Sequence, residues 1–231
     1  MMPEKIGGKK LKHIVFTLLS LKDFEGSLKE LSELPPRQVV NPLFSFFYHL
    51  DDLIRWRAIA AMGVSVANLA YQDMESARVV MRRLIWNLND ESGGIGWGSP
   101  EALGEIMACH EKLAQEYSRI LVSYFRKDGN YIEYEPLQRG VIWGLARLAH
   151  ERPELLITST RYILPYLVSG DATIRGFAAW ASGALDAELT RPFLEQLVDD
   201  PTKIIIFLDR QLQECTIASL AKEALKNHGS P

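Results

Sequence analysis

The sequence predicts an all-α protein built as a solenoid of antiparallel helix pairs. Three observations predict this class: apolar residues recur at helical spacing along nearly the whole chain, short polar turns separate these segments, and the second helix of several pairs repeats in sequence. The chain has 231 residues, of which 47% are hydrophobic and 24% charged. That balance is ordinary for a globular protein, and the length suffices for a sizeable core.

The first helix is predicted in the segment KKLKHIVFTLLSLKD near the N-terminus. Its apolar face contains Leu11, Val15, Leu18 and Leu19. Basic residues before a short apolar run loosely imitate a signal peptide, but Lys22 and Asp23 follow at once and a small-residue cleavage site is missing. No segment reaches the roughly 18 uninterrupted apolar residues of a membrane span. We therefore expect a cytoplasmic protein without membrane contact, with residues 1–10 flexible.

Further helical stripes and polar turns follow along the chain. Apolar stripes with helical spacing are formed by Leu43, Phe46, Phe47 and Leu50, by Ala77, Met81, Leu84 and Leu88, and by Tyr117, Ile120, Leu121 and Tyr124. Short polar turns at 51–52, 127–130 and 169–171 separate helices. This alternation predicts helices that come in antiparallel pairs.

The second helices of the predicted pairs share a sequence frame. LIRWRAIAAMG, which begins at Leu53, and TIRGFAAWASG, which begins at Thr173, share Ile-Arg, two alanines and a glycine. These small residues are Ala58 and Ala178, Ala61 and Ala181, and Gly63 and Gly183. PLQRGVIWGLA at 136–146 fits the same frame, and SPEALGEIMAC at 99–109 fits it more weakly.

The spacing of this frame predicts a repeat of roughly 37 residues. The position that holds Arg55 and Arg175 in the clear copies holds Glu101 and Gln138 in the other two. From Glu101 to Gln138 and from Gln138 to Arg175 the distance is 37 residues, whereas from Arg55 to Glu101 it is 46. The turn before residue 99 is therefore expanded.

The segments DDLIRWRAIAAMG and GDATIRGFAAWASGAL resemble the second helix of the HEAT-repeat, or armadillo-like, superhelical family. The resemblance covers most of the chain and implies a right-handed superhelix of about five to six helix pairs, in a single domain over residues 1–231. It also implies a concave surface lined by the second helices. In this family the arginine of the frame usually contacts an acidic turn residue, for which Asp51, Asp52 and Asp171 are candidates here.

The segment 203–227 departs from the repeat and is expected to form an atypical C-terminal cap. Its β-branched residues in KIIIF, the short turn at 209–210 and the polar strand-like QLQEC favour a small β-hairpin, followed by a helix from about Ile217 to Leu225. One more helix pair is the alternative.

The glycine-rich loop 91–98 lies in the expanded turn. It contains four glycines but no lysine, so a P-loop is excluded, and the segment before it is helical rather than a strand, which excludes a dinucleotide-binding loop. Ser99 is a candidate N-cap and Pro100 fits the first helical position. Glu91 is expected to pin the loop and Trp97 to anchor it, either by packing on the helices or by binding a partner.

Composition and motifs argue against several classes of site. The net charge of −3 and the pI of about 6.0 give no basic surplus for nonspecific nucleic-acid binding. The two cysteines and five histidines show no metal-ligand spacing, and a nucleophile–base motif is also missing. We therefore expect no catalytic residue, no metal and no cofactor, and an enzyme is the less favoured class.

These observations favour a protein-binding scaffold or adaptor that uses its concave face and the 91–98 loop. The candidate binding residues are Glu91, Trp97, Glu101, Glu105, Arg57, Arg139, Trp143 and Trp180. The alternative is a nucleic-acid-binding helical-repeat protein, for example one similar to the DNA-alkylation-repair glycosylases, in which aromatic and acidic groups line the groove. The low net charge speaks against that alternative.

Overall fold

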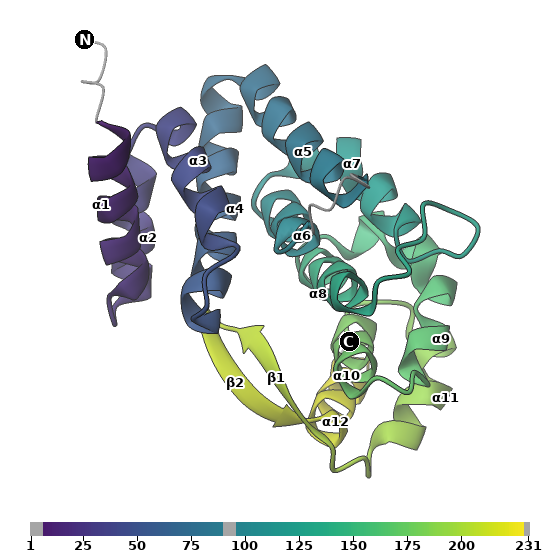
Figure 1. Cartoon of the computed structure of the whole chain (residues 1–231). Coiled ribbons are helices and arrows are strands. Elements are labelled where there is room, and N and C mark those ends of the chain that lie inside the picture. The colour runs from purple at the N-terminus through teal and green to yellow at the C-terminus, as the bar shows by residue number, and fades with distance from the viewer. Residues whose placement is uncertain (1–6, 90–95, 229–231) are drawn as a thin grey trace. The chain divides into compact units, whose positions relative to one another are not determined.

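The computed structural model describes residues 7–89 and 96–228, and these residues fall into two compact units divided between His110 and Glu111. Predominantly helical structure, as predicted, is found in both (Figure 1). Residues 8–10 form the first turn of α1, and the expectation that residues 1–10 are flexible stays a prediction. Residues 1–6 lie outside the described ranges. A single domain over 1–231 stays a prediction.

The first unit contains six helices within its described residues. They are α1 (Gly8–Ser20), α2 (Phe24–Glu33), α3 (Pro36–Phe46), α4 (Asp52–Gln72), α5 (Met74–Asn89) and α6 (Ser99–Cys109). The 21-residue α4 is the central element and packs against α2, α3, α5 and α6. Asp51 caps α4, because its carboxylate accepts hydrogen bonds from the Leu53 and Ile54 amides.

The second unit combines helices with a C-terminal hairpin. Its helices are α7 (Glu111–Ser123), α8 (Glu135–Glu151), η1 (Pro153–Leu155), η2 (Ile157–Tyr162), α9 (Leu164–Leu167), α10 (Ala172–Ser182), α11 (Ala187–Leu197) and α12 (Ile217–Asn227). The main packing contact joins α8 to α10, and α10 also packs against α12. The helices α4, α6, α8 and α10 begin within a residue of the predicted second helices, so the repeat frame located all four.

The C-terminal cap is a hairpin followed by a helix, which confirms that alternative over a further helix pair. Strands β1 (Lys203–Leu208) and β2 (Gln211–Thr216) pair antiparallel from Lys203 opposite Thr216 to Leu208 opposite Gln211. Asp209 and Arg210 form the turn with φ angles of 48° and 62°, the left-handed conformation of a two-residue hairpin turn. The hairpin lies beside α10 and α12 (Figure 1).

Small residues allow close packing on the second helices, as predicted. Ala58, Ala61, Ala178 and Ala181 are all buried. Gly176 of α10 lies under β1, and a Cβ atom there would come within 2.3 Å of Ile204 Cδ1. Any side chain at that position would therefore require the end of the Ile204 side chain to shift.

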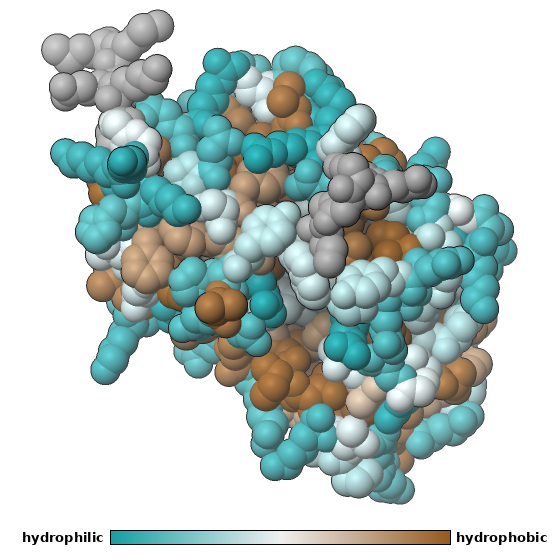
Figure 2. Space-filling view, in the orientation of Figure 1, coloured by the Kyte–Doolittle hydropathy of each residue, from teal (hydrophilic) through white to brown (hydrophobic). Residues whose placement is uncertain are grey.

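The surface mixes hydrophilic and hydrophobic groups. Figure 2 shows hydrophilic residues over much of one face, with separate groups of hydrophobic residues among them. Several large apolar side chains are exposed, including Tyr71, Val79 and Trp86 in the first unit. Isolated exposed apolar residues are ordinary, so a binding site has to be argued from a particular local arrangement.

Candidate functional site

The end of the glycine-rich loop returns to the protein at the start of α6. A Cβ atom on Gly96 would come within 2.8 Å of the Asn87 carbonyl oxygen, so the loop end lies against the last turn of α5. Gly98 then adopts a φ of 72° beside the Phe47 ring, which leaves no room for a side chain. Left-handed backbone and close approach together explain the glycine.

Trp97 lies between these two glycines and is partly exposed. It also makes an interaction with the surrounding protein. Residues 90–95 lie outside the described ranges, so the predicted roles of Glu91 and of an ordered loop there stay predictions. The prediction that Ser99 caps α6 is wrong: Gly98 is the N-cap, and the buried Ser99 hydroxyl has no hydrogen-bond partner within residues 7–89 and 96–228.

Trp86 lies one turn before the end of α5, near the point where Gly96 returns. Its side chain is 69% exposed, and Val79, seven residues earlier on the same helix face, is 54% exposed. Trp86 was not among the candidate binding residues predicted from the sequence. Its position beside a glycine-rich loop was the signal that would have identified it as a surface residue.

Glu101 occupies the arginine position of the repeat frame in α6. Burial raises the pKa of its carboxyl group from 4.5 to about 7, against smaller opposing effects of a backbone amide and of Arg55. One carboxylate oxygen, Oε2, is buried and has no hydrogen-bond partner among the described residues. A carboxyl group in this environment is partly protonated near neutral pH.

The other residues at the frame's arginine position all have partners in their own turns. Arg55 pairs with Asp52 at 3.0 Å. Gln138 donates from Nε2 to the Ile132 carbonyl at 2.6 Å. Arg175 donates to the Ser169 carbonyl at 2.6 Å. Glu101 is the exception, because a carboxylate has no proton to donate to such acceptors.

Two predicted groove residues are buried in the first unit, which contradicts their expected exposure. Arg57 donates to the carbonyl oxygens of Leu19 at 2.8 Å and Leu21 at 2.7 Å, and its guanidinium lies over the Phe24 ring. Glu105 is also buried, and its Oε1 lies 3.8 Å from the Cys109 sulfur. Arg57 therefore ties α4 to the end of α1 and satisfies carbonyls that α1 leaves open.

In the second unit, Arg139 and Asp171 form an ion pair. Arg139 is partly exposed and donates from Nε to Asp171 Oδ2 at 2.9 Å. Burial alone would raise the pKa of Asp171, but hydrogen bonds from Arg139 and the Ile174 amide lower it overall. Because Asp171 is the N-cap of α10, this pair connects α8 to the next second helix. Arg175 continues the pattern and contacts Asp200 at 3.0 Å.

The two candidate tryptophans of the second unit lie next to each other. Trp143 is buried and its indole nitrogen donates to the Phe207 carbonyl at 3.1 Å, so it fastens the hairpin to α8. The Trp180 ring lies 6.0 Å from that of Trp143 and stacks on His150 at 5.1 Å. Trp180 stays partly exposed and is the one of the two that a ligand can reach.

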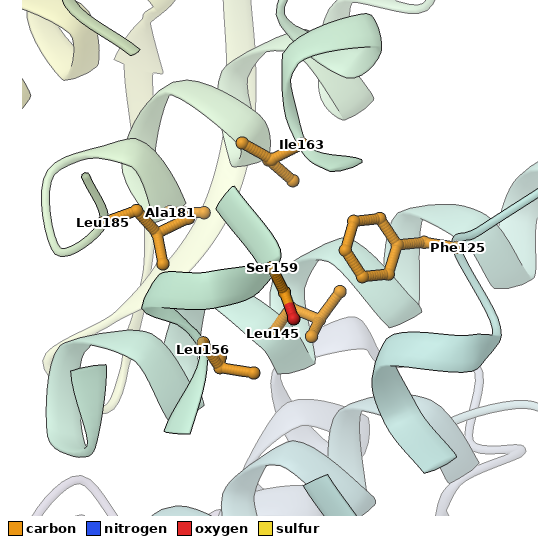
Figure 3. A pocket seen from close by; sticks show the side chains of 7 residues that line it. All are labelled: Phe125, Leu145, Leu156, Ser159, Ile163, Ala181 and Leu185. Atoms are coloured by element: carbon orange, nitrogen blue, oxygen red, sulfur yellow. The ribbon is translucent and has the colours of Figure 1, made fainter. Parts of the chain in front are cut away.

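Two concavities of the second unit share Phe125. The first is an apolar cavity of about 10 Å³, too small for an organic ligand; Figure 3 shows the side chains around it. The second is an open pocket of about 460 Å³ at the chain segment that follows α7. Sequence reasoning missed this pocket, because its wall combines residues 125–131 with residues 161–169.

The described residues provide neither a metal site nor a membrane span. Residues 7–89 and 96–228 contain no group of three or more histidine, cysteine or acidic side chains placed to hold a metal ion. In the same residues, no helix has both the length and the apolar character needed to cross a membrane.

Comparisons with known proteins add one distant relative and several structural neighbours. No protein-family model matches the chain. A protein of Archaeoglobus fulgidus, described as "Uncharacterized protein", is 29% identical over 119 residues, which are 52% of this chain. The matched region covers 56% of that relative, so the chain spans little more than half of its length.

The structural neighbours are engineered repeat proteins. The crystal structure of an engineered protein is similar with a TM-score of 0.52 and 16% identity, over 94% of this chain and 95% of that chain. A designed armadillo repeat protein in complex with the peptide (KR)4 has a TM-score of 0.49 and 16% identity, over 94% and 99% of the two chains. At such identities the likeness concerns the fold. The chain has an armadillo-like helical repeat fold.

Proposed function

We propose that this protein is a scaffold or adaptor that binds another protein at the loop end of the α5–α6 pair. The observation that carries the proposal is the exposure of Trp86, at 69%, beside the returning glycine-rich loop. Trp97 is partly exposed at the start of the next helix. Tryptophans dominate the binding energy of many protein interfaces, because a large rigid ring loses little conformational entropy when it is covered.

The armadillo-like fold supports this class of function. Stacked helix pairs offer extended helix surfaces, and rigid helices hold the connecting loops in place. The 91–98 loop belongs to the proposed site, with Glu91 and Trp97 as its expected contact residues. Trp180 in the second unit belongs to the proposed concave-face contacts, because it is partly exposed on a second helix.

The nucleic-acid alternative has weaker support. Trp143 and Arg139 are engaged by Phe207 and Asp171, which counts against a role for them in either kind of groove. The chain carries a net charge of −3, which disfavours a phosphate backbone. The observations therefore favour a protein partner over DNA or RNA.

The test is site-specific photo-crosslinking with the full chain. A photoreactive amino acid replaces Trp86 in one variant and Leu189, which is exposed on α11, in the matched control. We expect one protein to crosslink at position 86 and not at 189, and expect Trp97→Ala to reduce its yield. Equal crosslinking at both positions, or none at position 86, would overturn the proposal. Both replaced side chains are exposed, so folding should be retained.

A further inference from the structure

We propose that the open pocket of the second unit is a binding site for an organic anion that carries a flat ring. This inference goes beyond the scaffold function and does not depend on it. The pocket has a volume of about 460 Å³, within the usual range of small-ligand sites. It is lined by Phe125, Arg126, Lys127, Asp128, Tyr131, Gln138, Arg161, Tyr162, Pro165, Tyr166 and Ser169.

The charged groups of the pocket favour an anion. Three cationic side chains and one carboxylate line it, in a chain whose overall charge is −3. Asp128 accepts from Arg126 at 2.6 and 3.0 Å and thereby neutralises that guanidinium. Within residues 7–89 and 96–228, neither Lys127 nor Arg161 has a carboxylate within ion-pair distance. Arg161 interacts with Asp128 only at longer range and forms no ion pair with it. Lys127 and Arg161 therefore retain positive charge for a ligand, and phosphate or carboxylate matches them.

The aromatic wall favours a flat ring. Tyr162 lies next to both arginines, with the guanidinium carbons of Arg126 and Arg161 4.5 and 4.8 Å from its ring centre. Phe125 meets Tyr162 edge to face at 6.2 Å and packs on Tyr166 at 5.8 Å. These contacts fix the orientation of the wall before a ligand arrives, so a ring bound there loses less free energy to ordering.

The hydroxyl groups of Tyr166 and Tyr162 are compatible with an anionic ligand. The Tyr166 hydroxyl donates to the Phe125 carbonyl, and burial, with a contribution from Tyr131, raises the pKa of Tyr166. The uncharged Tyr166 hydroxyl does not repel a phosphate or carboxylate. The Tyr162 hydroxyl accepts a hydrogen bond from Arg161 at 2.8 Å, which holds that cation at the pocket.

The turn that carries Arg126 and Lys127 is held in place by its own contacts. The Gly129 amide donates to the Arg126 carbonyl at 3.0 Å, and Asn130 donates to the Ser123 hydroxyl at 3.1 Å. A Cβ atom on Gly129 would lie 2.6 Å from the Ser123 carbonyl oxygen, so the turn packs directly on the end of α7. The cations are thus presented by a fixed turn.

The experiment is calorimetric titration of the full chain with phenyl phosphate, which combines the ring and the anion. Phenol and inorganic phosphate supply each part alone. We expect phenyl phosphate to bind at least about tenfold more tightly than either. Arg161→Ala and Lys127→Ala should each weaken binding by about tenfold, the usual effect of one lost charged hydrogen bond. The matched control Arg191→Ala, an exposed arginine on α11, should bind like the wild type.

A short peptide containing phosphotyrosine distinguishes the two possible sources of an aromatic anion, which are a modified protein and a free small molecule. Tighter binding of the peptide than of phenyl phosphate assigns the pocket to a modified protein partner, and equal or weaker binding assigns it to a free small molecule. No binding of phenyl phosphate, binding equal to that of inorganic phosphate, or equal loss in Arg191→Ala would overturn the proposal. Crosslinking at position 86 is measured in the same variants, so failure of the scaffold proposal remains separate.

Discussion

Helices α6 and α10 occupy the same position in the repeat, but the polar residues at their starts differ in whether they have hydrogen-bond partners. In α10, Arg175 reaches the Ser169 carbonyl and Asp200, and the capping Asp171 receives Arg139. In α6, the corresponding residue is Glu101, whose Oε2 is buried without a partner in the described part of the chain. One backbone frame therefore accommodates both ion pairs between neighbouring turns and, in α6, a carboxyl group with one oxygen that has no partner among the described residues.

This difference shows that the residue at the repeat position stabilises the fold in α10 but not in α6. A buried polar atom without a partner costs free energy, so a protein optimised only for stability would not retain Glu101 in this position. Such departures concentrate at functional sites. Here the departure follows directly after Trp97 and the glycine-rich loop, which supports the choice of that loop as the proposed binding site.

Removing Arg175, the arginine of α10 that pairs with Asp200, should have the largest effect on stability. Arg175→Ala removes the hydrogen bonds to Ser169 and Asp200 and leaves the half-buried Asp200 without its cation. We expect the free energy of unfolding to fall by about 2–3 kcal/mol, measured by urea denaturation at pH 7. Arg191→Ala, on an exposed face, should change it by less than about 0.5 kcal/mol. Equal effects of the two would mean that the contacts of Arg175 contribute nothing.

Replacing the buried carboxyl group of Glu101 should instead increase the free energy of unfolding. The raised pKa of Glu101 means that the folded state resists its ionisation, so wild-type stability is lost as the pH rises from about 4.5 to about 7. Glu101→Gln cannot ionise, so it should exceed the wild type by about 1–3 kcal/mol at pH 8 and by much less at pH 4. Glu188→Gln, in the exposed first turn of α11, is the control. A pH-independent difference would contradict this explanation.

The smallest effect is expected at Arg55, the frame arginine of α4. Its pair with Asp52 is solvent-exposed, so Arg55→Ala should change stability by only about 0.5 kcal/mol at pH 5. Arg55 also lowers the pKa of Glu101, and its removal should therefore move that pKa upward. Carboxyl titration in the variant checks this. An unchanged Glu101 pKa would show that the two groups do not interact.

The sequence predicted most of the architecture because small residues and apolar spacing determine helix packing. The frame with Ala58, Ala178 and Gln138 located the second helices, and β-branching at 204–206 indicated the hairpin. Partners of polar side chains were harder to predict. Arg57 is buried because two carbonyls at the end of α1 need donors, and that requirement involves residues about 36 positions away.

The two proposed binding sites differ in how well the sequence alone predicts them. The glycine-rich loop was visible as an insertion in a repeat, so Trp97 was a candidate from the start. The anion pocket could not be recognised in the sequence, because the turn at 127–130 has the pattern of a simple connection between helices. Its cations gain a binding role only when the η2–α9 segment brings Tyr162 and Arg161 beside them.

The most direct test of the contrast between α6 and α10 is the titration of Glu101 itself. Carbon-13 NMR of the glutamate side-chain carboxyl groups, with Glu101→Gln used to assign the resonance, reports its pKa in the full chain. Burial without a partner predicts a midpoint near 7. A midpoint near the ordinary value of 4.5 would show that Glu101 is solvated or paired, and α6 would then be no exception within the repeat.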